Sequence, residues 1–180
     1  MKKGVLIFVS ILGSVCVAII LVIGGSGYMK KKTIEKEYQQ GVKLIQDYVT
    51  DYLVKNYEGI EKIEWQGIGV EYRNSPILGP SLFGNYVNTI VRVYISEDTY
   101  FSMYFSLSEE VEYDDNLHKY VKLRYLNPQN ADSAIQSGLR NEIHKLSPSE
   151  KEYFKDFKKS PSGSKKAKVV YNLDIHELTY

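Results

Sequence analysis

An uncharged apolar run near the start of the chain constrains the architecture more than any other feature. Residues 4–23 are twenty consecutive positions without a charged side chain. At ~1.5 Å per residue, a helix of this length spans roughly 30 Å, the thickness of the hydrocarbon core of a bilayer. The run predicts one transmembrane helix within an anchor of residues 1–29, followed by a single domain of residues 30–180. The alternative is a secretion signal cleaved near residues 24–27, although the apolar part of such signals is usually shorter, at ~7–15 residues.

The charges around this run bear on its orientation. Two lysines and the amino terminus precede it, and Lys30, Lys31 and Lys32 follow it. The positive charges on the two sides are therefore nearly equal in number, and the positive-inside rule favours neither orientation. A two-lysine start directly before a long apolar run is typical of export signals. We therefore expect a single-pass protein of the cell membrane, with residues 4–23 in the bilayer and the domain outside the cytoplasm. Cys16, the one cysteine, lies within the run in a context that does not fit a lipid-attachment signal.

The charge of the domain helps to exclude one class of partner. After residue 32 the chain carries 18 basic and 22 acidic side chains, without a basic stripe. A nucleic-acid partner is not expected for such a surface. With a single cysteine, neither an intramolecular disulfide nor a cysteine metal site can form.

The first half of the domain reads as a helix followed by strands. Apolar residues recur at spacings of three and four over residues 30–57, which predicts an amphipathic helix that acts as stem and as packing partner, with Gly59 as the residue beyond its C-terminus. From residue 60 the period changes to two, and Gly67 interrupts the alternation, as at a β-bulge. Residues 86–96 and 100–107 alternate around a short polar turn, which predicts a hairpin whose apolar face is central to the core.

The second half continues with mixed elements. We interpret residues 108–116, which hold five carboxylates, as a solvated acidic turn, and residues 120–126 as a strand. Residues 131–146 have helical spacing, and residues 147–150 form a capping box that begins a second short helix, in which Phe154 and Phe157 make the apolar contact. Residues 169–175 alternate as a last strand. The expected fold class is α+β: an antiparallel sheet packed against the N-terminal amphipathic helix and two short helices.

No arrangement of residues in this chain is typical of catalysis or of cofactor binding. His118, His144 and His176 lie in separate elements without the spacing of a metal site, and no glycine-rich phosphate loop or nucleophile elbow occurs. We expect no catalytic, cofactor or metal residues, and no enzyme activity. The six lysines of the tract at residues 155–168 are interleaved with acidic residues, which indicates a solvated surface.

One loop is a candidate contact site. Residues 73–85 contain prolines and glycines, and yet they carry four large apolar side chains: Ile77, Leu78, Leu82 and Phe83. Such a loop either folds back on the core or contacts a partner, and loops often carry function.

The layout resembles that of small, single-pass, exported proteins of Gram-positive bacteria, streptococci in particular, whose activity is uncharacterised. The resemblance lies in the Met-Lys-Lys start, the apolar helix, the lysine-rich stem, the Tyr-rich domain and the segments 60–65 and 94–99. Some membrane-tethered proteins of similar build act as immunity proteins against secreted toxins. The expected function is therefore a membrane-tethered, extracytoplasmic binding protein with a protein partner, immunity-like in kind. The alternative is a cell-envelope hydrolase acting on wall or lipid substrates, with two carboxylates, or a carboxylate and His176, in one cleft.

Overall fold

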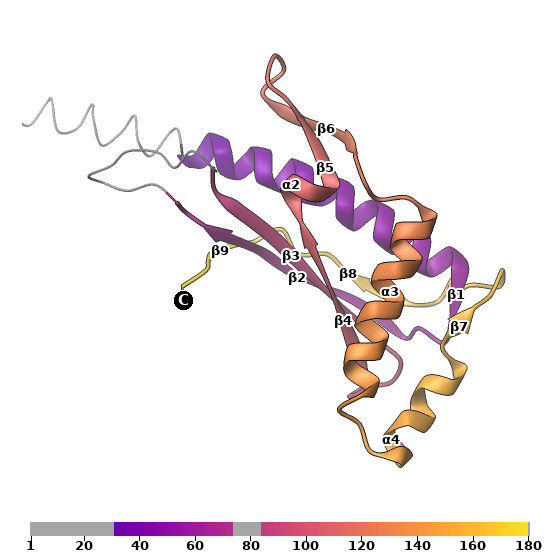
Figure 1. Ribbon diagram of the computed structural model, residues 1–180. Coiled ribbons are helices and arrows are strands. Elements are labelled where there is room, and N and C mark those ends of the chain that lie inside the picture. The colour runs from indigo at the N-terminus through magenta and orange to yellow at the C-terminus, as the bar shows by residue number, and fades with distance from the viewer. Residues whose placement is uncertain (1–30, 74–83, 180) are drawn as a thin grey trace, which may run out of the picture. The chain divides into compact units, whose positions relative to one another are not determined.

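The computed structural model describes residues 31–73 and 84–179. The chain divides into two compact units, Met1–Lys36 and Glu37–Tyr180, and the following concerns the second. A helix that is continuous over residues 31–56, called the long helix below, contributes its residues 37–56 to this unit. The other elements follow in chain order (Figure 1): β1 (Tyr57–Glu58), β2 (Lys62–Glu71), β3 (Tyr86–Tyr94), β4 (Tyr100–Ser106), α2 (Leu107–Glu110), β5 (Val111–Asp114), β6 (Lys119–Leu123), α3 (Pro128–Ile143), α4 (Pro148–Lys151), the 3₁₀ helix η1 (Glu152–Asp156), β7 (Lys158–Lys159), β8 (Lys168–Val170) and β9 (Ile175–Glu177).

The α+β class is confirmed, and the central hairpin forms where the sequence predicts it. β2, β3 and β4 pair antiparallel in that order. The register of β2 against β3 shifts between Trp65 and Ile68, at the predicted bulge. Gly67 has φ of 90°, a conformation that side-chain-bearing residues rarely adopt, and its carbonyl accepts a hydrogen bond from Thr89 Oγ1 at 2.8 Å.

The expectation of a purely antiparallel sheet is wrong, because the last strand runs parallel to β2. β8 pairs with residues 62–64 and β9 with residues 68–70, so the sheet is mixed. The segment between them leaves the ladder opposite the bulge, where Ile68 N donates to Asp174 O at 2.9 Å. Two side chains of the long helix hold this segment: Gln39 Nε2 donates to Leu173 O at 3.0 Å and Gln46 Nε2 to Asn172 O at 2.7 Å. A pattern of alternating residues carries no information on strand direction.

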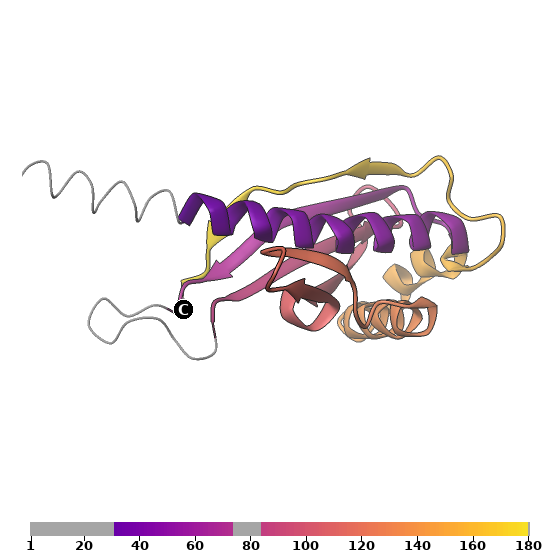
Figure 2. The same cartoon turned by 90° about the horizontal axis from the view of Figure 1, so that it is seen from above.

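The core lies between the sheet and the helices. The long helix crosses one face of the sheet, and α3 runs beside β4 (Figures 1 and 2). The predicted helical stripe is confirmed as the buried side of the long helix, with Val42, Ile45 and Leu53 fully buried. Trp65 of β2 is 1% exposed, and its indole Nε1 donates to Thr50 Oγ1 of the long helix at 3.0 Å.

The acidic stretch exposes Glu109, Glu112 and Asp115 to solvent, as predicted, but it is not a single turn. Leu107 and Val111 are buried, and they hold residues 107–110 as one helical turn and residues 111–114 as a strand paired with β6. The resulting hairpin lies on the long helix at Gly41, where an added Cβ would stand 2.6 Å from Leu107 Cδ1 and 2.8 Å from the Tyr120 ring. The absence of a side chain at Gly41 therefore makes room for the hairpin.

The helices of the second half are placed as expected, with shifted boundaries. α3 begins three residues earlier than predicted, because the Asn127 side chain accepts a hydrogen bond from Asn130 N at 3.0 Å. The capping box at Ser147 is present, and Phe154 and Phe157 are buried. Gly59 is not the helix cap: β1 intervenes, and Gly59, with φ of 82°, instead turns the chain into β2.

Two of the predicted features fall on residues that the structure does not describe. The anchor of residues 4–23 and the apolar loop with Ile77, Leu78, Leu82 and Phe83 lie outside the described ranges. Among the helices within those ranges, none combines the length and the apolar character that crossing a bilayer requires.

Candidate functional site

The side of the sheet that faces away from the long helix is rich in tyrosine and charged residues. The register places its side chains in rows across β2, β3 and β4: Lys62 with Tyr94 and Tyr100, then Glu64 with Arg92 and Ser102, then Gln66 beside Ile90 and Tyr104. We call these nine residues the open face. All except Tyr94 are at least partly exposed, whereas the alternate residues of the same strands form the core.

Ion pairs and ring contacts fix the side chains of the open face. Lys62 Nζ lies 2.7 Å from a carboxylate oxygen of Glu64 and 3.8 Å from the centroid of the Tyr94 ring. The guanidinium carbon of Arg92 lies 5.0 Å from the centroid of the Tyr100 ring. A side-chain hydrogen bond with Tyr94 is the main cause that raises the pKa of Arg92 above its ordinary value. These contacts leave few alternative positions for the aromatic and charged groups.

A groove of about 650 Å³ separates the open face from α3 and is called the α3 groove. The helix approaches the strand closely because Gly138 lacks a side chain, since a Cβ there would lie 2.5 Å from the carbonyl oxygen of Ser102. Tyr104, beside the groove on β4, is 70% exposed. The lining residues are Gln66, Ile90, Arg92, Tyr100, Ser102, Tyr104, Gly138, Asn141, Glu142 and Lys145.

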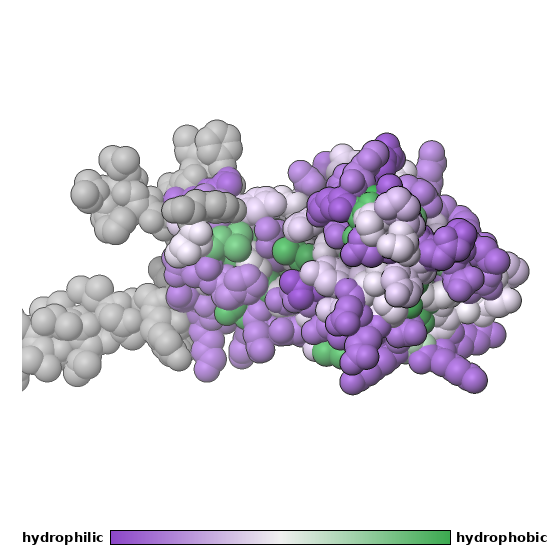
Figure 3. All heavy atoms as spheres, turned by 90° about the horizontal axis from the view of Figure 1, so that it is seen from below, coloured by the Kyte–Doolittle hydropathy of each residue, from purple (hydrophilic) through white to green (hydrophobic). Residues whose placement is uncertain are grey.

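The surface on this side of the domain is mixed in polarity. Figure 3 shows mostly hydrophilic and intermediate residues, with apolar residues as small separate spots. Tyr and Arg are enriched in protein interfaces, where they supply large contact area together with hydrogen bonds. The open face therefore has a composition that is typical of protein contact surfaces.

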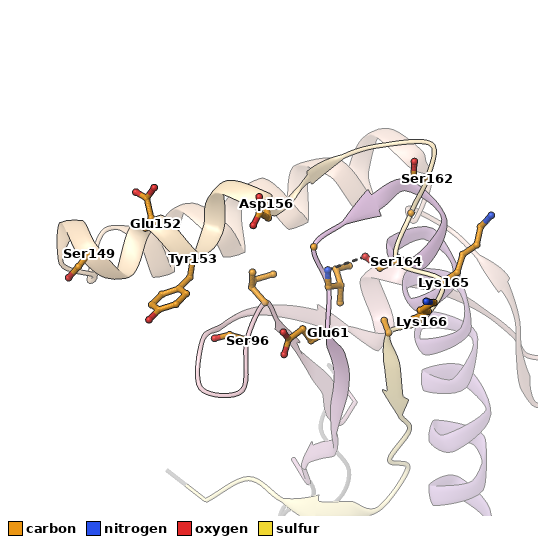
Figure 4. Close-up of a pocket in the computed structure, with 15 residues that line it drawn as sticks. Glu61, Ser96, Ser149, Glu152, Tyr153, Asp156, Ser162, Ser164, Lys165 and Lys166 are labelled. Carbon is orange, nitrogen blue, oxygen red and sulfur yellow. Dashed lines mark hydrogen bonds between the residues drawn. The ribbon is translucent and has the colours of Figure 1, made fainter.

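A second hollow, of about 860 Å³, lies where β2 begins and β3 ends (Figure 4). Tyr153 and Asp156 point from η1 toward the strand ends that carry Glu61 and Ser96, whereas Lys165 points outward. Glu61, Glu152 and Asp156 are exposed residues, and Glu152 is ion-paired with Lys155. The carboxylates of this hollow are therefore open to solvent, and one of them is already paired with a lysine.

A third cluster joins four elements through one carboxylate. Asp132 of α3 accepts hydrogen bonds from Tyr52 Oη at 2.7 Å, Tyr57 Oη at 2.8 Å and Lys159 Nζ at 2.5 Å. Burial raises the pKa of Asp132, but the hydrogen bonds from Lys159, Tyr52 and Tyr57 lower it by more, so it lies below its ordinary value of 3.8. None of these four residues lines the α3 groove or the second hollow, and their contacts tie the long helix, β1, α3 and β7 together.

The structure separates the residues that the sequence singled out. His118 is at the tip of the β5–β6 hairpin and His176 is on β9, so neither borders the hollow with the carboxylates. Within residues 31–73 and 84–179, no group of three His, Cys, Asp or Glu residues could hold a metal ion. Three lysines of the tract are ion-paired, namely Lys155, Lys158 and Lys159.

Sequence reasoning missed the open face, although a signal for it was available. The strand alternation that identifies the core also identifies the opposite side chains, among them Arg92 and Tyr104. The contact with α3, and with it the groove, depends on Gly138, whose close approach to β4 leaves no mark in the sequence.

Comparison with protein family models, with characterised proteins and with solved structures gave no match. The case for a function therefore depends on the geometry of this chain alone.

Proposed function

We propose that this chain is a membrane-tethered binding protein whose domain lies outside the cytoplasm and binds a protein partner through the open face. The observation that carries the proposal is the rigid set of tyrosines and Arg92 beside the α3 groove. An immunity-like role, in which the partner is a secreted toxin, is one form of this function. The apolar run of residues 4–23 supports the tether, and its length supports an anchor that is retained.

The choice of the open face over the remaining surface follows from composition and rigidity. Large aromatic side chains with few rotatable bonds lose little conformational entropy on binding, so they contribute more affinity per contact than lysine or glutamate. Tyr94 and Tyr100, whose ring centroids are 5.0 Å apart, are already held in place before a partner arrives.

Site-specific photocrosslinking tests the binding surface. In the full chain, in its own membrane, a photoreactive phenylalanine analogue replaces Tyr104, and in separate variants Tyr153 or Tyr125, which are 57% and 52% exposed. We expect a discrete protein adduct from position 104 and none from position 125, which is of similar exposure but lies away from both hollows. Equal labelling from 104 and 125, or none from either, would contradict the proposal.

The same series addresses a cell-envelope hydrolase, the second candidate, which the carboxylates around Glu61 favour. Tyr153 borders that hollow, so a wall or lipid substrate would be labelled from position 153 rather than from position 104.

Protease treatment of intact cells tests the topology. With the domain outside, an added protease removes the domain and leaves a protected fragment that contains residues 4–23. If the domain were in the cytoplasm, the full chain would survive until the cells are lysed. An intact-mass measurement of the membrane fraction checks retention of the anchor, because cleavage at the small residues would remove residues 1–27.

A further inference from the structure

Arg92 differs from the other cations of the open face and the α3 groove in its partners. Lys62 is paired with Glu64 at 2.7 Å, and Lys145 with Glu142 at 3.0 Å. Within the parts of the chain that the structure describes, Arg92 has no carboxylate within 4.0 Å, and the nearby charge of Glu64 is engaged by Lys62. Arg92 hydrogen-bonds to Tyr94 and lies in the field of Glu64, but it forms no ion pair with a described residue, so among the described cations of the groove it is the one best placed to pair with an incoming carboxylate.

The position of Arg92 suits it to bind a carboxylate. A guanidinium presents five N–H donors in one plane and can donate two parallel hydrogen bonds to a carboxylate. The Tyr100 ring at 5.0 Å restricts the guanidinium, and Arg92 is partly buried on a central strand, so little entropy is lost when a ligand engages it.

The neighbours of Arg92 limit the ligand further. Ile90 and the Tyr104 ring offer apolar surface along the same groove, and Gln66 and Asn141 offer amide groups that can bond to a peptide backbone. Glu142 in the groove and Glu64 beside it neutralise Lys145 and Lys62, so Arg92 supplies the net positive charge there and matches a single negative group, whereas a nucleic acid or a polyphosphate would bring many. One carboxylate next to an apolar residue fits better than a run of negative charge.

We propose that the α3 groove binds an acidic peptide segment of the partner, in which an Asp or Glu carboxylate engages Arg92 and an adjacent apolar side chain contacts Ile90 and Tyr104. This inference rests on the proposed function, because it names the chemistry of the partner that the open face would bind.

The test uses the full chain in detergent micelles with the photoreactive residue at position 104. The probes are two biotinylated, terminally blocked peptides of Gly and Ser that hold one leucine and differ at the position beside it: the Glu peptide has a single glutamate there, and the Gln peptide has a single glutamine. We expect the Glu peptide to be labelled with an affinity at least about tenfold higher than that of the Gln peptide, since a charge-assisted bidentate contact contributes about that factor. Raising the salt concentration should weaken labelling by the Glu peptide and leave the Gln peptide unchanged.

Variants assign the effect to Arg92. Arg92→Gln should lose the preference for the Glu peptide, and Arg92→Lys should keep part of it, because lysine retains the charge without the planar fork. Arg124→Gln is the matched control, since Arg124 also stacks on a tyrosine, at 5.2 Å from the Tyr125 centroid, but does not line the groove. Far-UV circular dichroism of each variant checks that the fold is retained.

Several results would overturn the inference while leaving the proposed function in place. These are equal labelling by the two peptides, an Arg92→Gln variant that behaves like Arg124→Gln, or a polyphosphate that competes as well as the Glu peptide. If the cellular adduct at position 104 is also absent, the proposed function fails together with the inference.

Discussion

Replacing Trp65 by alanine is expected to lower the free energy of unfolding by about 3–5 kcal/mol, the usual cost of truncating a large buried aromatic residue. Trp65 is 1% exposed, and its ring centroid lies 6.2 Å from that of Phe105. The change would leave a cavity between the sheet and the long helix and would also leave the Thr50 hydroxyl without its donor. Since domains of this size are stable by about 5–15 kcal/mol in total, the variant would lose a large fraction of the stability of the domain.

Urea unfolding followed by far-UV circular dichroism measures this loss; fluorescence cannot, because Trp65 is the one tryptophan of the chain. Trp65→Phe is the control that separates the two contributions. It retains an aromatic ring in the core but still loses the hydrogen bond to Thr50, so we expect a smaller loss, of about 1–3 kcal/mol. A loss below about 1 kcal/mol for Trp65→Ala would mean that the indole is not at the centre of the core.

Asp132→Ala is expected to have the second-largest effect, at about 2–4 kcal/mol, because three donors lose a shared acceptor at once. The expected loss is smaller than the sum of three separate charged hydrogen bonds. The Asp132 side chain is 30% exposed, so in the variant water can reach the three donors and replace part of the lost hydrogen bonding. Chemical denaturation measures the effect. Asp51→Asn is the matched control: its ion pair with Lys55 is on the surface of the long helix, and its loss should cost less than about 0.5 kcal/mol.

The Asp132 cluster also makes stability depend on pH in a defined direction. The pKa of Asp132 is lower in the folded protein than its ordinary value of 3.8, so its contribution is present above pH 3.8 and is lost as the pH falls below it. Burial first, and then the hydrogen bond to Asp132, raise the pKa of Tyr57 above its ordinary value of 10.0. That contribution is therefore present below pH 10 and is lost as the pH rises further.

Asp132→Asn separates the charge from the hydrogen-bond geometry. Asparagine can still accept from Tyr52 and Tyr57, but it cannot titrate. The difference in unfolding free energy between the wild type and Asp132→Asn should shrink from pH 5 toward pH 2. A difference that stays constant over this range would show that the ionised carboxylate does not contribute to stability.

The elements of the fold that the sequence predicts correctly are those determined by residues close together in the chain. The stripe on the long helix, the β3–β4 hairpin, the bulge at Gly67 and the capping box at Ser147 each arise within a few residues, and each was predicted. The parallel addition of β8 and β9 was not, because it depends on contacts with Gln39 and Gln46, more than a hundred positions away. The acidic stretch was wrongly predicted as a turn, because the prediction followed its many carboxylates and gave too little weight to Leu107 and Val111, which are buried.

The candidate site was less predictable than the fold. The sequence predicts a contact site at the apolar residues of the loop at residues 77–83. These residues lie outside the described ranges, so the contact site stays a prediction. Arg92 could be assigned to the solvent side of its strand from alternation alone. Among the described residues Lys62 and Lys145 each pair with a carboxylate and Arg92 does not, and this difference depends on distances between side chains of several elements, which no sequence pattern encodes.

The parallel pairing of β2 with β8 has a consequence for synthesis of the chain. Lys62 is paired with Lys168, so one edge of the sheet must wait for more than a hundred further residues before its partner exists. Until then the backbone groups along this edge of β2 face water. Gln39 and Gln46 also lack their acceptors, the carbonyl oxygens of Leu173 and Asn172. Contacts of such long sequence separation form late in folding, and an exposed strand edge can pair with a wrong chain in the meantime. Chains truncated before residue 168 should therefore aggregate more readily than the full chain, wherever the domain folds.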